Sequence, residues 1–449
     1  MGHGRSSTNG TRQVDVVVVG GGLAGFAAAA TAARAGRSVL LLDGHPGANR
    51  AATETVGRFR FNKGAHALYR RGAARPVLGR LGVTVSGSRP PIVGGRGRRG
   101  DVVDRLPLDP VSVIRTRLVS ARGVARLGRV LAGLPRWRPA ELADRTAAAW
   151  FDDLGLDGDE RQVVEMLART ATYVADLDTV SADLVALQVG LAVRGNVEYL
   201  DGGWQTLLDG LAAAGARAGV ERVGDVARSV VPEGRRVTVV TGGQDGEGGT
   251  VLAGAVVLAT GTPEAMAALL PERPAAWAGL AGPVHAACLE LGLAAPPPVR
   301  VLLGLDRPLY LICHAPPARL APPGAAVVHG LRYLHAGEAP PPGEARADLE
   351  AHARLAGIDP AGAEESRYRH RMVTFGALPT PATGGLAGRP GPAGTGLDGV
   401  FVAGDWLGPD GHLADAALST GETAGRLAAE RAAAATRAPA GGLTQVAGD

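Results

Sequence analysis

Residues 14–43 read VDVVVVGGGLAGFAAAATAARAGRSVLLLD, which contains a strand, a glycine turn, a helix and a second strand in unbroken order. Residues 14–19 are an apolar, β-branched run that is typical of a strand buried on both faces. Residues 27–35 continue an alanine-rich helix, Gly36 ends it, and residues 38–42 form the next apolar run. The stretch therefore predicts a βαβ unit at the start of a Rossmann-like α/β domain.

The turn between the first strand and the helix carries Gly20, Gly22 and Gly25 at the GxGxxG spacing of dinucleotide-binding sites. The first glycine makes the tight turn, the second lets the backbone approach a pyrophosphate, and the third lets the helix pack close to the strand. Asp43 ends the second strand about 20 residues after the glycines, where a carboxylate can accept hydrogen bonds from a ribose. This arrangement predicts a dinucleotide site.

The glycine spacing alone is weak evidence, because the chain contains 67 glycines among 449 residues and three at this spacing are expected by chance. The preceding apolar strand, the following helix and the acid that closes the second strand make the assignment specific. Since the first N–H groups of a helix have no partner within it, those of Leu23 and Ala24 are expected to face the phosphates.

The composition is that of a globular protein with two or three domains, with 46% hydrophobic and 20% charged residues. The net charge of +4 does not indicate nucleic-acid binding, because the basic residues are not interleaved with aromatic ones. Cys288 and Cys313 are the only cysteines, and His329 and His335 lack the spacing of metal ligands, so neither a disulfide framework nor a metal site is expected. Residues 1–13 are polar and no apolar run is long enough to span a membrane, which favours a cytoplasmic protein.

Three further segments carry recognisable motifs. Residues 59–68 read FRFNKGAHAL, residues 196–211 read NVEYLDGGWQTLLDGL, and residues 400–425 read VFVAGDWLGPDGHLADAALSTGETAG. Together with the opening βαβ unit, they resemble the FAD-dependent amine oxidase, phytoene desaturase and protoporphyrinogen oxidase superfamily. One segment departs from that pattern: members often have a GGR motif soon after the strand-terminal acid, whereas residues 47–50 of this chain read GANR.

The resemblance implies that the cofactor is FAD. It implies that Asp405, which follows Gly404, hydrogen-bonds the ribityl chain, and that the N-terminus of the last helix points its dipole at the flavin pyrimidine. Beyond the glycine turn and Asp43, the residues that it places at the cofactor are Arg50, Gly64, Ala65, Val226, Leu413, Ala414 and Ala416.

Lys63 and His66 are expected to lie beside the isoalloxazine and to act in catalysis, Lys63 as a cation and His66 as a proton acceptor with a pKa of about 6.5. The resemblance implies hydride transfer from an organic substrate to FAD. A dehydrogenase or oxidase that acts on C–C bonds of a small lipophilic substrate is the first choice, because Leu413 stands where amine oxidases tend to place an aromatic residue. A flavin-dependent amine or amino-acid oxidase is the second, and a non-redox isomerase or FAD-binding protein is the third. The electron acceptor and the oligomeric state stay open.

The domain organisation follows from the positions of these motifs. Residues 14–75, 200–275 and 386–435 are expected to form a discontinuous FAD-binding domain, with residues 76–199 and 276–385 as a mixed α+β substrate domain. Residues 1–13 and 436–449 are expected to be disordered. Residues 111–138 carry many arginines and no acid, which fits a basic amphipathic helix whose polar face is either simply solvated or in peripheral contact with a membrane surface.

Overall fold

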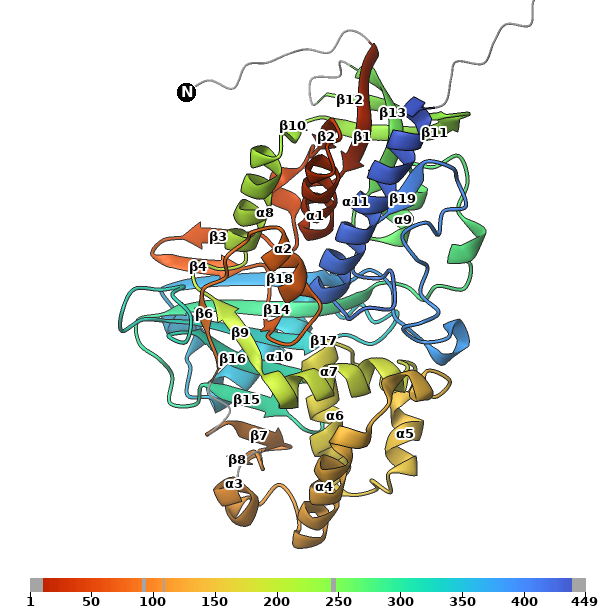
Figure 1. Cartoon of the computed structure of the whole chain (residues 1–449). Helices are drawn as coiled ribbons and strands as arrows, with labels where there is room; N and C mark the ends of the chain where they lie inside the picture. Colours follow the sequence, from red (N-terminus) through yellow and green to blue (C-terminus); the bar gives the residue numbers. More distant parts are fainter. Residues whose placement is uncertain (1–10, 91–93, 108–109, 244–247, 438–449) are drawn as a thin grey trace, which may run out of the picture.

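The computed structural model describes residues 11–90, 94–107, 110–243 and 248–437, and its elements form two large sheets with helices around them (Figure 1). The first strand, β1, begins at Thr11, so the expectation that residues 11–13 are disordered is wrong: they pair with residues 250–252 of a neighbouring strand. The same expectation for residues 1–10 and 438–449 lies outside the described residues.

The first sheet is built on the predicted βαβ unit. Its order is β10-β2-β1-β13-β12-β11, with β19 also paired to β13, and β10, β2, β1, β13 and β19 run parallel. Residues 16–19 of β1 and all of β2 are buried, as their β-branched and leucine-rich sequences require. The bounds are β1 Thr11–Val19, β2 Val39–Leu42, β10 Glu221–Val223, β11 Val226–Glu233, β12 Arg236–Gly242, β13 Gly248–Leu258 and β19 Val400–Val402.

Three helices cover one face of the first sheet: α1 (Leu23–Arg34), α8 (Gln205–Arg217) and α11 (Ala414–Arg437) (Figure 1). α1 and α11 approach each other closely through small residues. A Cβ atom added at Gly421 would lie 2.4 Å from the carbonyl oxygen of Ala24, and one added at Gly425 would lie 2.4 Å from that of Ala28. Glycine is therefore needed at both positions, and the last helix is fixed against the first.

The second sheet has the order β18-β14-β17-β16-β15-β7-β8 and is largely antiparallel. Its long central strands carry apolar side chains into the cores on both faces. Its bounds are β7 Arg96–Arg99, β8 Val102–Arg105, β14 Val284–Leu293, β15 Val301–Gly304, β16 Leu309–Ala315, β17 Ala326–Tyr333 and β18 Glu365–Phe375, and α10 (Pro342–Leu355) packs on it.

The remaining elements connect or extend these two sheets. A hairpin and a small three-stranded sheet lie between them, and a group of helices lies at the lower end of the molecule (Figure 1). The strands are β3 Thr53–Val56, β4 Phe59–Asn62, β5 Leu68–Tyr69, β6 Gly87–Ser88 and β9 Val197–Leu200, and the helices are α2 Ala74–Arg80, α3 Pro110–Arg115, α4 Ala121–Gly133, α5 Ala147–Asp153, α6 Asp159–Thr172, α7 Ala182–Gly195 and α9 Pro263–Ala267.

The basic segment 111–138 is not one amphipathic helix, contrary to expectation. It is divided between α3, α4 and a short 3-10 turn at Leu134–Arg136. The break before α4 has a local cause, because the Ser120 hydroxyl accepts a hydrogen bond from the backbone N–H of Gly123 at 3.2 Å and so starts a new helix.

Candidate cofactor and substrate site

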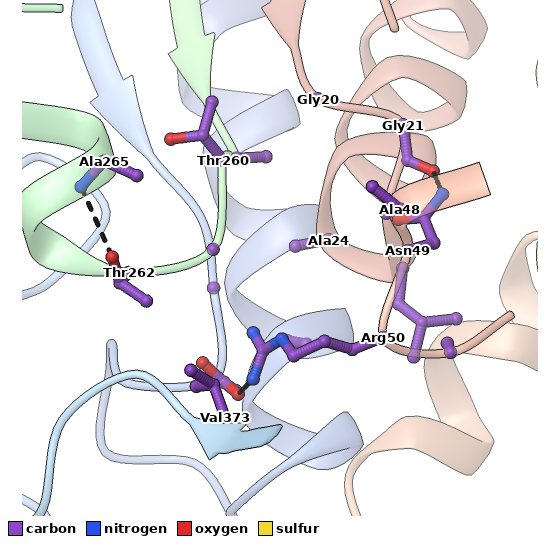
Figure 2. Close-up of a pocket in the computed structure, with 18 of the residues that line it drawn as sticks. Gly20, Gly21, Ala24, Ala48, Asn49, Arg50, Thr260, Thr262, Ala265 and Val373 are labelled. Atoms are coloured by element: carbon purple, nitrogen blue, oxygen red, sulfur yellow. Dashed lines mark hydrogen bonds and ion pairs between the residues drawn. The ribbon is translucent and has the colours of Figure 1, made fainter. Parts of the chain in front are cut away.

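A cavity of about 730 Å³ opens at the carboxyl ends of β1 and β2 and extends to the second sheet (Figure 2). Ligands of open α/β sheets bind at this edge. Most of the residues predicted at the site line this cavity: Gly20, Gly22, Leu23, Ala24, Asp43, Arg50, Lys63, Ala65, His66, Val226, Gly404, Asp405, Leu413 and Ala414. Its lining also includes residues that were not predicted, among them Asn49, Tyr173, Trp204, Met372 and Thr374. In the described part of the chain, Gly25, Gly64 and Ala416 lie outside this lining.

The three glycines of the turn differ in backbone conformation and in the space around each Cα atom. Gly20 has φ +106°, and a Cβ there would lie 2.6 Å from the carbonyl oxygen of Ala259. A Cβ at Gly25 would lie 1.8 Å from the carbonyl oxygen of Gly20. Gly22 has an extended backbone (φ −87°, ψ −174°) that any residue can adopt, and its nearest neighbour would be Asn49 Oδ1 at 3.2 Å. Glycine at 20 and 25 is thus required by the protein itself, whereas glycine at 22 leaves space in the cavity.

The N-terminus of α1 faces that space. Gly22, Leu23 and Ala24 all line the cavity, the helix has no side-chain cap, and no acidic residue stands in its first turn. Free backbone N–H groups and the positive end of a helix dipole bind phosphate groups. The open Gly22 position and the uncapped helix together fit the pyrophosphate of a dinucleotide.

Asp43 lies at the end of β2 as predicted and is 6% exposed. Its Oδ2 accepts a hydrogen bond from Arg222 Nη2 at 2.6 Å. Arg222 also lies over the ring of Phe26, with its guanidinium carbon 5.4 Å from the ring centre. The cation therefore holds the carboxylate in place beside the glycine turn.

The side chain of Arg50 extends across the cavity towards Val373 (Figure 2). Its Nη1 donates to Asp405 Oδ2 at 2.6 Å and to the carbonyl oxygen of Thr374 at 3.1 Å. Asp405 is 5% exposed, and its Oδ1 accepts from the N–H of Gly376 at 3.3 Å. The carboxylate expected at the ribityl chain is thus paired with the arginine of the GANR segment.

Lys63 and His66 both line the cavity, although they follow each other closely in the chain. Lys63 Nζ lies 3.3 Å from Glu54 Oε1 and also donates to the carbonyl oxygen of Gly47. His66 Nδ1 lies 2.9 Å from the carbonyl oxygen of Gly64, and its ring packs 4.9 Å from that of Trp204.

The expected pKa of His66 was wrong. Burial lowers the pKa of His66 to about 4, so the imidazole is neutral at pH 7. A carbonyl oxygen only accepts, so Nδ1 must carry the proton in this contact and Nε2 keeps the lone pair. The ring is a hydrogen-bond acceptor and a weak base, and it is not poised to titrate near pH 6.5.

The start of α11 brings Leu413 and Ala414 to the cavity. Leu413 has φ +51°, an uncommon value for a leucine, immediately before the helix begins. Asp415 points away to α2, where its Oδ1 accepts from the N–H of Ala74 at 2.8 Å, and burial raises the pKa of Asp415 to about 6. Ala416 is fully buried in the interior. The helix N-terminus therefore reaches the cavity through Leu413, Ala414 and Ala417.

Several lining residues were not predicted. Tyr173 follows α6 with φ +62°, and its hydroxyl donates to the carbonyl oxygen of Ala65 at 3.1 Å. Met372 and Thr374 come from β18, far along the sequence. Trp204 lies in the motif segment 196–211, where its large aromatic side chain could have indicated a cavity-lining residue. The others had none, because only the tertiary fold brings them to the cavity.

Within the described residues, no group of three or more His, Cys, Asp or Glu side chains could hold a metal ion. In the same residues, no helix has the length and apolarity needed to cross a bilayer.

Comparison with known proteins agrees with this architecture. Residues 18–81 match the model of an NAD(P)-binding Rossmann-like domain. A search of curated proteins finds no match. Among solved structures, wild-type putrescine oxidase bound to putrescine is similar with a TM-score of 0.71 at 16% identity, over 94% of this chain and 100% of that one.

Two further structures show how widely the fold is used. Cyclohexylamine oxidase from Brevibacterium oxydans has a TM-score of 0.70 at 19% identity, over 93% of this chain and 99% of that one. RAB GDI from Plasmodium falciparum has a TM-score of 0.54 at 12% identity, over 95% and 99%. The similarity confirms the fold class that the sequence motifs implied: the chain has the fold that putrescine oxidase and cyclohexylamine oxidase share.

Proposed function

We propose that this protein is an FAD-dependent oxidoreductase. The observation that carries the proposal is the continuity of one cavity from the uncapped N-terminus of α1, past Asp43 and Arg50, to His66 and Leu413. Such a cavity accommodates an extended dinucleotide with its reactive ring at the far end. FAD, when bound, supplies a ring that accepts a hydride.

The chain's own residues would bind and orient this cofactor. The N–H groups at Leu23 and Ala24 would bind the pyrophosphate, and the Asp43 carboxylate, held by Arg222, would accept from the ribose. Val226 lines the same end of the cavity and would contact the adenine. Asp405, held by Arg50, would face the ribityl chain.

We further propose that the substrate is a lipophilic molecule without an ammonium group that is oxidised at a C–C bond. The lining at the His66 end includes Tyr173, Trp204, Met372 and Leu413, which are largely apolar. The carboxylates of the described lining are Asp43, Asp225 and Asp405, and Arg50 neutralises the one nearest this end. An ammonium group would therefore lack an unpaired carboxylate there. An amine oxidase is the second candidate, favoured by the names of two structural neighbours.

Two measurements test the proposal. The purified protein should be yellow, and heat should release one FAD that mass spectrometry identifies. An anaerobic screen of polyenes, porphyrinogens and amines should then bleach the flavin absorbance with a polyene or a porphyrinogen. Release of NAD would contradict the cofactor, bleaching by amines alone would contradict the substrate class, and FAD that no substrate bleaches would favour a non-redox protein.

His66 and Lys63 carry the next prediction. We expect His66→Ala and Lys63→Met each to lower the rate of flavin reduction by on the order of 100-fold, with FAD content near normal, because both side chains line the reactive end of the cavity. Since the pKa of His66 lies at about 4, the wild-type rate should not change between pH 6 and pH 8 through this group. Stopped-flow absorbance measures both effects, and unchanged rates in both variants would assign these residues a structural role.

We also propose that the exposed face of α4 contacts anionic membrane surfaces. Arg122 and Arg129 are exposed on one flank of α4 and Leu131, which is 49% exposed, is on the other, whereas Arg126 is paired with Asp157 and Glu160. Exposed arginines on a surface helix suit an anionic lipid headgroup layer. Flotation with phosphatidylserine vesicles should recover the protein at low salt, and Arg122→Glu/Arg129→Glu should not float. Equal flotation of both proteins would refute this contact.

A further inference from the structure

Glu290 is a charged residue inside an apolar strand. It lies in β14 between Leu289 and Leu291, and its side chain is fully buried. Burial raises the pKa of Glu290, and the nearby Arg369 opposes that shift. A buried carboxylate is costly unless specific partners hold it, so its contacts define what it does.

One partner of Glu290 lies on the turn that carries both candidate catalytic residues, and the other two lie in β18. Its Oε1 accepts from the backbone N–H of Gly64 at 2.8 Å and from Arg369 Nε at 3.2 Å. Its Oε2 lies 3.2 Å from Arg367 Nε. The carboxylate thus links β14 and β18 of the second sheet to the turn after β4.

Gly64 has little freedom to move once this bond is made. Its φ is +89°, and an added Cβ would lie 2.3 Å from the terminal methyl carbon of Met372. Its N–H also donates to the carbonyl oxygen of Asn62 at 2.9 Å. With the N–H held by Glu290, the carbonyl group of the same residue is directed at His66 Nδ1, 2.9 Å away.

The same network reaches Lys63. Glu54 contacts Lys63 Nζ at 3.3 Å and Arg369 Nη2 at 3.5 Å, and it also pairs with Arg367. The two arginines therefore stand between Glu54, which is 43% exposed, and the buried Glu290. One chain of charges fixes the positions of both cavity-lining residues.

We propose that Glu290 is a positioning residue: by holding the N–H of Gly64 it orients the Gly64 carbonyl group, which selects the His66 tautomer with the proton on Nδ1 and the lone pair on Nε2. The proposal rests on the proposed function only for the catalytic use of that lone pair. The tautomer itself is a property of the protein alone. Glu290 acts through its hydrogen bond to the Gly64 N–H and not through the negative charge of its carboxylate.

Two conservative variants separate reach from charge. Glu290→Gln keeps an oxygen within reach of the Gly64 N–H but loses the charge, whereas Glu290→Asp keeps the charge but is one methylene shorter. We expect Glu290→Gln to retain the wild-type tautomer and Glu290→Asp to lose it. A residue that served only to neutralise Arg367 and Arg369 would give the opposite order.

The readout is the nitrogen spectrum of the full-length protein labelled with ¹⁵N-histidine at pH 7, with the His66 signals assigned by their loss in His66→Gln. Wild type and Glu290→Gln should show a protonated Nδ1, and Glu290→Asp should show a mixture of tautomers. Glu160→Gln is the matched control, because Glu160 is similarly buried and ion-paired, but its partner is Arg126 of α4 and not the arginines that contact Glu290. It should leave the His66 signals unchanged.

Rate measurements complete the test. With a substrate that reduces the flavin, Glu290→Asp should lower the reduction rate about 10-fold at unchanged KM and FAD content, and Glu290→Gln should change it less than about 3-fold. Retention of the Nδ1 tautomer in Glu290→Asp, its loss in Glu290→Gln, or a wild-type ring protonated on Nε2 would overturn the proposal. If no substrate reduces the flavin, the proposed function fails, while the spectra still decide the role of Glu290.

Discussion

Gly22→Val is expected to fold like the wild type and to lose its cofactor. The extended backbone at Gly22 accepts a β-branched residue, and the nearest protein atom to an added Cβ, Asn49 Oδ1 at 3.2 Å, has to move only slightly. The added methyl groups would occupy cavity space in front of the α1 N-terminus, where the pyrophosphate is proposed to bind. FAD affinity should fall by at least about 100-fold, or about 3 kcal/mol.

Fluorescence titration of the apoprotein with FAD measures the affinity, and circular dichroism with thermal unfolding in the absence of FAD measures the fold. The melting temperature of apo Gly22→Val should be close to that of apo wild type. Normal FAD binding by this variant would show that the cavity in front of α1 is not the pyrophosphate site. Gly22→Ala, with a smaller side chain, should fall between the two.

Gly25→Ala, in contrast to Gly22→Val, is expected to lower the free energy of unfolding of the protein strongly, even in the absence of FAD. The new Cβ would lie 1.8 Å from the carbonyl oxygen of Gly20, so strand β1 and helix α1 would have to separate. Overpacking of this kind costs about 1–3 kcal/mol, and more where backbone is the obstacle. That cost exceeds the gain of about 1 kcal/mol that alanine brings over glycine within a helix.

Urea unfolding of the apoprotein tests the second prediction. The matched control is Gly79→Ala in α2, another helical glycine, whose added Cβ meets nothing within 4 Å. It should be as stable as wild type or slightly more so. A Gly25→Ala protein as stable as Gly79→Ala would contradict the close approach of α1 to the turn after β1.

The βαβ unit could be predicted from sequence because its signals are local. The apolar run, the glycine turn and the strand-terminal Asp43 stand within one short stretch, and the structure places them as expected in β1, α1 and β2. The strand pair that becomes β11 and β12 also follows from alternation within its own residues. Local patterns predict local structure well.

The chemistry of the site depended on contacts that no local pattern contains. Arg222 and Asp43 are separated by 179 residues, and Glu290 and Gly64 by 226. The depressed pKa of His66 arises from burial by elements on both sides of the cavity. Glu290 did leave one signal, a lone acid in the apolar run LELGL, but its partner could not be read from the sequence.

The contact of α11 with α1 through Gly421 and Gly425 has a consequence for biosynthesis. β19 and α11 complete the first sheet and its helical cover, yet they are made about 400 residues after the glycine turn that they support. A nascent chain therefore carries an incomplete nucleotide-binding half, with part of the apolar face of α1 uncovered, until residues 400–437 have been made. The cavity that is proposed to hold the cofactor is complete only after these residues have folded onto the first half of the chain, because Asp405, Leu413 and Ala414 line it.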